Sequence, residues 1–205
     1  MPKGHSVTST SAIRDHYDRL SAFYRLWWGE HIHHGYWVAG ESPAQAQAQL
    51  TQRLAAEAGV PRGASVLDVG CGFGASARWL AARLDCRVLG ITLSRVQARR
   101  AAEAAQREGL DGRLRFAVHD AGDLDTVGGG PFDVVWIIEC SEHLPDRARF
   151  FASCGRLLRP GGTLALCAWL RGPATEDRPP AALERLCRGM LCPMLSSPAE
   201  IRRCI

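Results

Sequence analysis

The fold of this chain is decided by the stretch Val66-Leu67-Asp68-Val69-Gly70-Cys71-Gly72-Phe73-Gly74, in which an apolar run leads into three alternate glycines. Residues 75–84 then continue in a helical pattern. This order is typical of a buried parallel strand that turns sharply into a helix, because glycine adopts backbone angles that a Cβ atom excludes. Glycine also lets a ligand lie against the free N–H groups at the start of the helix. The stretch therefore predicts a site for a nucleotide-like molecule.

Apolar runs and helical patterns alternate on both sides of this turn. Strands are expected at 65–70, 86–92, 114–120, 132–139 and 163–169, and helices at 75–84, 94–108 and 146–158. The first, fourth and fifth runs are almost continuously apolar, as in a parallel sheet that helices cover on both faces. The pattern predicts an α/β, doubly wound domain that binds ligands at the carboxyl ends of its strands.

The regions that flank this alternation have a different character. Residues 13–28 and 43–58 follow helical patterns, and the loop between them contains His31-Ile32-His33-His34-Gly35-Tyr36-Trp37. Residues 171–182 are rich in proline, arginine and alanine, which is typical of a connector. Short helices are expected near 182–191 and 198–204.

Composition and charge narrow the function classes. The chain has 205 residues, of which 46% are apolar and 22% charged, as in an ordinary soluble domain. The net charge is +4, and the arginines are scattered along helices, which argues against a nucleic-acid surface. No apolar run reaches the ~18 residues that a membrane span needs, and residues 1–14 lack the apolar segment of a signal peptide. We therefore expect a cytoplasmic protein with neither a nucleic-acid partner nor a membrane span.

The cysteine pattern favours a reducing compartment. Eight cysteines occur without a CxxC pair, and most lie in apolar segments, where a thiol acts as a small hydrophobe. Cys187 and Cys192 stand apart from other types of metal ligand, and no cluster of carboxylates lies close in sequence to the histidines at 31–34. We expect neither a disulfide framework nor a metal site.

The residues after the second expected strand help to identify the ligand. A dinucleotide site places an acid about 20 residues after the glycines, at the end of that strand, where it holds the ribose hydroxyls. The corresponding position falls near Thr92, and no acid occurs between Asp85 and Glu103. An NAD-dependent oxidoreductase is therefore a disfavoured alternative.

The motifs taken together resemble those of class I S-adenosylmethionine-dependent methyltransferases. The resemblance rests on VLDVGCGFG at 66–74, GITLSRVQ at 90–97, Asp120-Ala121, ECSEHLPD at 139–146 and RLLRPGG at 156–162. Within that superfamily, HIHHGYW at 31–37 and GITLSRVQ are similar to the tocopherol and sterol methyltransferase group, and cyclopropane-fatty-acid synthases are more distant. The resemblance implies S-adenosyl-L-methionine as the cofactor.

The resemblance also implies which residues hold the cofactor. Thr92, Leu93 and Gln97 would replace the usual acid at the ribose, and Asp120 would accept a hydrogen bond from the adenine amino group. Two other interpretations stay open: Asp120 as a helix cap and Gln97 as an exposed helix residue. The full set of implied cofactor contacts is Tyr17, His33, Asp68, Gly70, Cys71, Gly72, Gly74, Thr92, Leu93, Gln97, Asp120, Ala121 and Glu139.

Catalysis of methyl transfer needs positioning of the acceptor and, for some acceptors, a base that removes a proton. The candidates are Glu139, Glu142 and His143 at the end of the fourth strand, together with His34. Glu139 could instead hold the amino group of the cofactor or cap the next helix, and the histidine loop could be a packed lid. The resemblance suggests a small, apolar or aromatic natural-product acceptor, methylated on carbon, nitrogen or oxygen.

The resemblance further implies a Rossmann-like sheet of five parallel strands in the order 3-2-1-4-5. Residues 1–60 would form an N-terminal helical lid, 61–170 the cofactor-binding core and 171–205 a substrate cap. Relatives continue through a longer cap to two further strands, so this cap is expected to be truncated and the fifth strand to be left as an edge. That edge invites a partner or a second copy of the chain. The alternative to an active methyltransferase is therefore a non-catalytic cofactor-binding or interaction protein.

Overall fold

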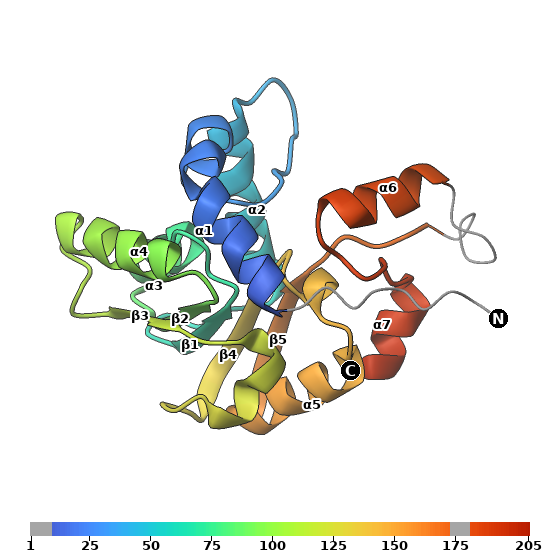
Figure 1. Ribbon diagram of the computed structural model, residues 1–205. Coiled ribbons are helices and arrows are strands. Elements are labelled where there is room, and N and C mark those ends of the chain that lie inside the picture. The colour runs from blue at the N-terminus through green and yellow to red at the C-terminus, as the bar shows by residue number, and fades with distance from the viewer. Residues whose placement is uncertain (1–9, 173–180) are drawn as a thin grey trace.

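A parallel sheet of five strands forms the centre of the computed structural model, which describes residues 10–172 and 181–205 (Figure 1). The strands are β1 (Ser65–Val69), β2 (Arg87–Thr92), β3 (Leu114–Val118), β4 (Phe132–Ile138) and β5 (Leu158–Cys167). Their order is β3-β2-β1-β4-β5, and every neighbouring pair is parallel. The predicted fold class and strand order are confirmed, and β5 lies at one edge of this sheet.

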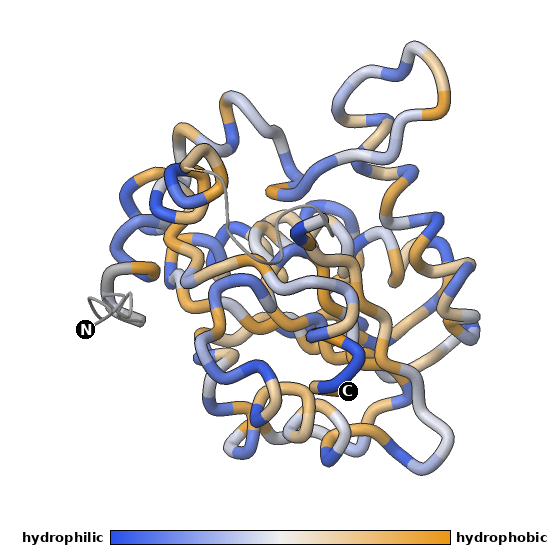
Figure 2. The backbone as a smooth tube through the Cα atoms, turned by 90° about the vertical axis from the view of Figure 1, so that its right-hand side faces the viewer, coloured by the Kyte–Doolittle hydropathy of each residue, from blue (hydrophilic) through white to orange (hydrophobic). Residues whose placement is uncertain are grey.

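Both faces of the central strands are buried, which explains their nearly continuous apolar sequence. Val66 and Trp136 lie in a cluster on one face of the sheet, and Leu67 and Ile137 lie in a second cluster on the other face. All four side chains are fully buried. Each such side chain contributes about 1.5–3 kcal/mol of burial free energy. In Figure 2 the hydrophobic segments of the backbone gather in the middle of the molecule.

Helices cover both faces of the sheet. Residues of α2 (Pro43–Glu57), α3 (Ala75–Leu84) and α4 (Arg95–Arg107) pack into the first cluster. Residues of α5 (Arg147–Leu157), α7 (Pro198–Cys204) and the 3₁₀-helix η1 (Ala121–Thr126) pack into the second. Polar caps fix several helix starts: Ser42 and Gln45 form a capping box at α2, and the Ser94 side chain accepts from the Gln97 N–H at α4.

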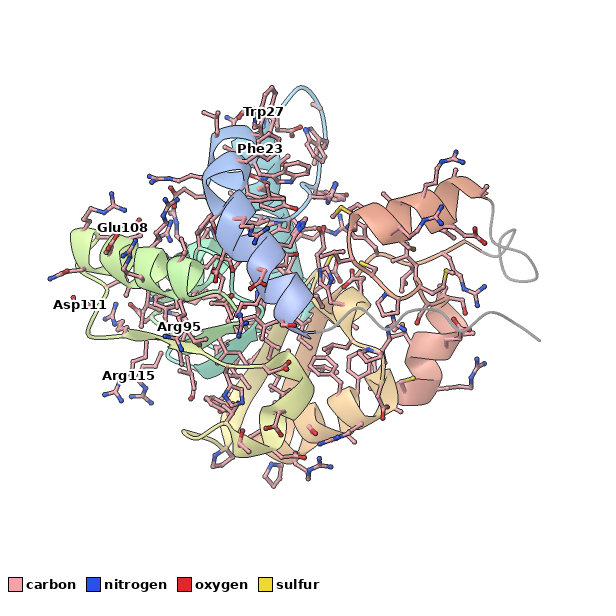
Figure 3. The ribbon with its side chains drawn as sticks, viewed as in Figure 1. Phe23, Trp27, Arg95, Glu108, Asp111 and Arg115 are labelled. Atoms are coloured by element: carbon pink, nitrogen blue, oxygen red, sulfur yellow. The ribbon has the colours of Figure 1, made fainter. Side chains whose placement is uncertain are left out.

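Two elements lie at the carboxyl ends of the strands. Helix α1 (Thr10–Trp27) packs against α4, and its outer end presents Phe23 and Trp27 to solvent (Figures 1 and 3). A short 3₁₀-helix, η2 (Ser141–His143), follows β4 directly.

Helix α6 (Ala181–Gly189) lies further along the chain. Among the described residues no helix is long and apolar enough to cross a membrane.

The fifth strand differs from its predicted range of 163–169. Pairing begins at Leu158, opposite Phe132, and the register then shifts before Thr163 pairs with Val134. The Pro-Gly-Gly segment at 160–162 therefore lies within the strand as an irregularity instead of separating it from α5. The strand ends at Cys167, so Trp169 lies beyond it. Residues 1–9 and most of the expected connector at 171–182 lie outside the described part of the chain.

Candidate functional site

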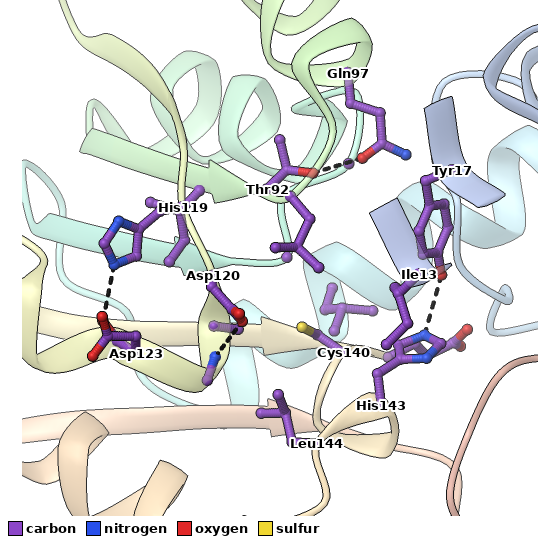
Figure 4. A pocket seen from close by; sticks show the side chains of 18 of the residues that line it. Ile13, Tyr17, Thr92, Gln97, His119, Asp120, Asp123, Cys140, His143 and Leu144 are labelled. Atoms are coloured by element: carbon purple, nitrogen blue, oxygen red, sulfur yellow. Dashed lines mark hydrogen bonds between the residues drawn. The ribbon is translucent and has the colours of Figure 1, made fainter. Parts of the chain in front are cut away.

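A cavity of about 500 Å³ lies where the central strands end, beneath α1 (Figure 4). Its position is the switch point of the sheet, because β1 has β2 on one side and β4 on the other. Its volume falls within the usual range for small-molecule sites. Nine of the implied cofactor residues line it: Tyr17, Gly70, Gly72, Thr92, Leu93, Gln97, Asp120, Ala121 and Glu139.

The three glycines of the turn all have positive φ angles, yet their surroundings differ. A Cβ atom on Gly70 would lie 2.5 Å from the Cys140 Sγ, and one on Gly74 would lie 2.7 Å from the Phe116 ring. A Cβ on Gly72 would meet only Ile32, at 3.6 Å. Gly70 and Gly74 thus make room for protein side chains, whereas Gly72 leaves space at the cavity wall. Phe116 also excludes a Cβ on Gly90, which would lie 2.7 Å from the ring.

The end of β2 supplies a polar pair in place of an acid. The Thr92 hydroxyl donates to the Gln97 Oε1 at 2.7 Å, and the Gln97 amide nitrogen remains as a donor at the cavity wall (Figure 4). Gln97 is only 3% exposed, so its interpretation as an exposed helix residue is wrong. Ser94 caps α4 by accepting from the Gln97 N–H, and this cap fixes the direction of the first helical turn. Gln97 therefore points inward.

Asp120 acts as a helix cap, one of the two roles that the sequence left open, and it also lies at the cavity, where the other role would place it. Its Oδ1 accepts from the Gly122 N–H at 2.8 Å and thereby caps η1, while the residue also lines the cavity. The cap orients the carboxyl group and leaves its second oxygen for a ligand. His119 lies beside it and donates through Nε2 to the Asp123 carbonyl at 2.9 Å.

Asp68, Cys71 and His33 line a small hollow of about 30 Å³ behind the glycine turn, and this hollow shares Gly70 and Gly72 with the wall of the large cavity. The Asp68 Oδ2 is buried without a hydrogen-bond partner among the described residues, and burial raises the pKa of this carboxyl to about 7. His31 and His33 share a hydrogen bond of 2.9 Å in the same hollow. Burial lowers the pKa of both rings, to about 3 for His31, so both imidazoles are neutral at pH 7.

A niche of about 40 Å³, distinct from the hollow at Asp68, adjoins the large cavity. Tyr17, Ile32, Glu139 and His143 line both spaces and so form their junction. The rest of the niche is largely aromatic and sulfur-bearing, and two of the four catalytic candidates, His34 and Glu142, lie only here. Its remaining walls are Tyr24, Trp28, His34, Glu142, Trp169, Met190, Cys192 and Leu195.

His34 and Glu139 form a closely paired dyad in this niche. The His34 backbone N–H donates to the Glu139 Oε1 at 3.0 Å, and the ring Nδ1 lies 3.0 Å from Oε2. The hydrogen bond to Glu139 raises the pKa of His34 against the opposing effect of burial. Burial alone would raise the pKa of Glu139, but the bonds from His34, with a smaller contribution from the Trp169 side chain, together lower it. Glu139 has φ +49°, a left-handed conformation that costs a non-glycine residue about 1–3 kcal/mol and is concentrated at functional sites.

His143 and Glu142 are held by other partners. The His143 Nδ1 faces the Leu191 carbonyl at 3.4 Å, so this nitrogen carries the proton and Nε2 accepts from the Tyr17 hydroxyl at 3.1 Å. Glu142 is 5% exposed and accepts from the Trp169 N–H and from the Ser141 hydroxyl. Burial raises the pKa of Glu142.

Several residues of the niche have no counterpart among the sequence-based candidates. Trp169 contacts the His34 ring edge-on, with ring centroids 4.4 Å apart, and Trp28 contacts it at 6.0 Å. Trp169 ends an apolar run, so its place at the carboxyl end of a strand was a usable signal. Trp28, Met190 and Leu195 carried no such signal. Within the described ranges no three His, Cys, Asp or Glu side chains are grouped as metal ligands, and all eight cysteines are free.

Comparison with known proteins identifies relatives over most of the chain. The sequence profile of the mycolic acid cyclopropane synthetase family matches residues 5–177. A probable chloroplastic tocopherol O-methyltransferase of Oryza sativa subsp. japonica is 36% identical over 200 residues, which cover 90% of this chain and 55% of the relative. The chain thus spans about half the length of this relative and of a tocopherol O-methyltransferase of Arabidopsis thaliana that it also matches.

Two solved structures extend this comparison. The structure of the 4+2 cyclase SpnF is 28% identical with a TM-score of 0.81, and the match covers 96% of this chain and 70% of that one. The structure of a geranyl diphosphate methyltransferase in complex with SAM is 25% identical with a TM-score of 0.74, covering 85% of this chain and 76% of that one. The cyclase shows that this fold also carries other reactions, so function has to be argued from the site.

Proposed function

The chain belongs to the mycolic acid cyclopropane synthetase family, and on this premise we propose that it is an S-adenosyl-L-methionine-dependent methyltransferase of a small molecule. The proposal is supported most by one observation: the large cavity and the aromatic niche meet at Tyr17, Ile32, Glu139 and His143. A cofactor in the cavity and an acceptor group in the niche would face each other at this junction, as in-line transfer requires.

The residues of the cavity fit S-adenosyl-L-methionine. The backbone at Gly70 and Gly72 lines the wall, Gln97 offers an amide donor, and Asp120 offers a carboxylate oxygen. These groups would hold the ribose hydroxyls and the adenine amino group. Behind the turn, the unpartnered Oδ2 of Asp68 would receive the amino group of the methionine part, directly or through water. When bound, the cofactor supplies a methyl group on a positively charged sulfur.

The acceptor is an apolar or aromatic small molecule with one reactive polar group. Tyr24, Trp28 and Trp169 give the niche an aromatic wall, and a volume of about 40 Å³ admits only the reactive end of such a molecule. The tocopherol O-methyltransferase named above has an acceptor of this kind by its name. We further propose that residues 1–60 act as a lid and residues 171–205 as a substrate cap.

Calorimetry with three ligands tests the cofactor. S-adenosyl-L-methionine and S-adenosyl-L-homocysteine should bind, and NAD should not. Binding of NAD alone would favour an oxidoreductase, and binding of none of the three would refute the proposal.

Methyl transfer itself is tested with the radiolabelled cofactor and a panel of phenols, sterols and amines. Labelled product is the expected result. Tight cofactor binding without transfer to any of the panel would favour a non-catalytic cofactor-binding protein.

A further inference from the structure

The niche contains one side-chain nitrogen that is free to accept a proton, and it belongs to His34. A carboxylate only accepts hydrogen bonds, so the His34 Nδ1, at 3.0 Å from the Glu139 Oε2, carries the ring proton. In the neutral ring the Nε2 atom is then unprotonated, and none of the described residues provides it with a hydrogen-bond partner. His143, the other imidazole that lines the niche, already accepts from Tyr17 through its Nε2.

The carboxylates of the niche are already engaged. Both oxygens of Glu139 accept from His34, one from the backbone N–H and one from the ring. In Glu142, Oε1 accepts from the Trp169 N–H and Oε2 accepts from the Ser141 hydroxyl. Each carboxylate oxygen of the niche thus already accepts one hydrogen bond, whereas the His34 Nε2 accepts none. In the neutral ring this nitrogen is the open polar atom of the niche, and it suits an acceptor that donates a hydrogen.

From this arrangement we propose that His34 is the catalytic base, that Glu139 positions it, and that the acceptor is a weakly acidic hydroxyl on an aromatic ring. This assignment rests on the proposed methyltransferase function and names its acceptor atom. The ring would enter between Trp28 and Trp169, whose rings already contact His34. The niche volume of about 40 Å³ limits entry to the hydroxyl-bearing edge.

The reaction balances without any further reactant. The acceptor O–H bond breaks and its proton passes to the His34 Nε2, while an oxygen lone pair forms the new C–O bond. The C–S bond breaks, and its electron pair stays on sulfur, which becomes a neutral thioether. His34 then releases the proton to solvent. The products are a methyl ether, S-adenosyl-L-homocysteine and one proton.

Several titratable groups surround His34 and take part in its pH dependence. Glu139 is the dominant one, because it bonds to the ring directly and favours the protonated form. Tyr17 and Tyr24 come from α1, and Glu142 and His143 come from η2. His33 precedes His34 in the chain, and Cys192 follows α6. Because base function requires neutral His34, the transfer rate should rise with pH through the His34 pKa.

The dyad can be measured without turnover. In a proton NMR titration, the ring signal that disappears in His34→Asn identifies His34, and its pKa should be above 6.5. Glu139→Gln should lower that pKa, whereas the control Glu142→Gln, which lacks a bond to His34, should change it less. Phenol should shift the His34 signal, and anisole, which has no hydroxyl proton, should not. Absence of any phenol-specific shift would overturn the acceptor assignment.

Kinetics distinguish a base from a merely structural residue. His34→Asn keeps an amide donor for Glu139 but removes the base, and it should reduce kcat for phenol about 100- to 1000-fold. With 4-nitrophenol, which is largely ionised at about pH 8, the reduction should be less than about 10-fold because no proton needs to be removed. Equal losses for both acceptors would mean that His34 only positions the substrate.

The outcomes separate this inference from the proposed function. Failure of S-adenosyl-L-methionine to bind would refute both. Cofactor binding with label found only on amines or on ring carbon would refute the hydroxyl acceptor and leave the methyltransferase standing. If neither phenol nor any other acceptor is methylated, the NMR comparison of phenol with anisole decides.

Discussion

The large cavity and the adjoining niche differ in how the chain builds them. Most of the cavity wall comes from short, contiguous motifs at strand ends, such as the glycine turn and the Thr92–Gln97 segment. The niche is assembled from side chains far apart in the sequence, including Trp28, His34, Trp169 and Leu195. A cofactor can thus be held by local structure, whereas acceptor recognition depends on how distant segments pack. Substitutions in the two regions should separate cofactor affinity from acceptor affinity.

Gly72→Val should have the largest effect on the cavity. The side chain would project from the wall into open space, so cofactor affinity should fall at least about 1000-fold, or about 4 kcal/mol. Calorimetry measures it. The matched control is Gly59→Val, since Gly59 has a similar φ, +58° against +54°, and nothing lies within 4 Å of its Cβ position. If both variants lose the cofactor equally, backbone strain and not cavity space is responsible.

Asp68→Asn should reveal the cost of burying a carboxyl behind the turn. The folded pKa of Asp68 is about 7, above its ordinary value of 3.8, so the unfolded chain ionises first as pH rises. Relative to Asp68→Asn, the wild type should lose about 3–4 kcal/mol of stability as pH rises from about 4 to about 7, then level off. Urea denaturation at several pH values measures this difference.

The opposite pH dependence is expected at Asp133, which makes it a suitable control. The backbone N–H of Ser65 and the Arg159 side chain lower the pKa of Asp133. Its stabilising contribution is therefore lost as pH falls, so Asp133→Asn should change the slope in the other direction. If the stability difference between the wild type and Asp68→Asn does not change with pH, the Asp68 carboxyl is better solvated than the structure indicates.

Asp120→Asn should weaken cofactor binding by about 10-fold, because asparagine is also a good N-cap and only the carboxylate acceptor is lost. Thermal unfolding should change little. Asp146→Asn is the matched control: Asp146 caps α5 through the Arg149 N–H and does not line the cavity. Equal affinities of both variants for S-adenosyl-L-homocysteine would show that Asp120 is only a cap.

Trp169→Phe should give the smallest effect and should confine it to the niche. The smaller ring loses part of its contact with His34, so the KM for the acceptor should rise about three- to five-fold while cofactor affinity stays constant. Trp37→Phe, at a position that is 49% exposed and outside the niche, should change neither quantity. A change in cofactor affinity for Trp169→Phe would mean that the two regions are not independent.

The contrast between the regions also explains what the sequence could predict. The α/β sheet followed from apolar periodicity and the glycine turn, because both are local patterns, whereas its strand order came from the family resemblance. Cofactor candidates such as Thr92 and Asp120 also came from the resemblance, and they lie where strand ends meet at one edge of a parallel sheet. The His34–Glu139 pair joins residues 105 positions apart, and only the packed chain brings them to 3.0 Å. The extended range of β5 was missed because Pro160 and Gly161 normally end an element.

Phe116 links two positions that lie far apart in the sequence. Its ring fills the space over both Gly74 and Gly90, and Gly90 has no positive φ angle that would otherwise require glycine. Residue 116, together with Cys71, whose Sγ would lie 3.0 Å from the same Cβ atom, therefore limits the residue allowed at 90. Among relatives, glycine at 90 should accompany an aromatic residue at 116, and alanine should appear at 90 where residue 116 is smaller. Such paired variation would show that the space between residues 90 and 116 is limited by core packing, independently of any ligand.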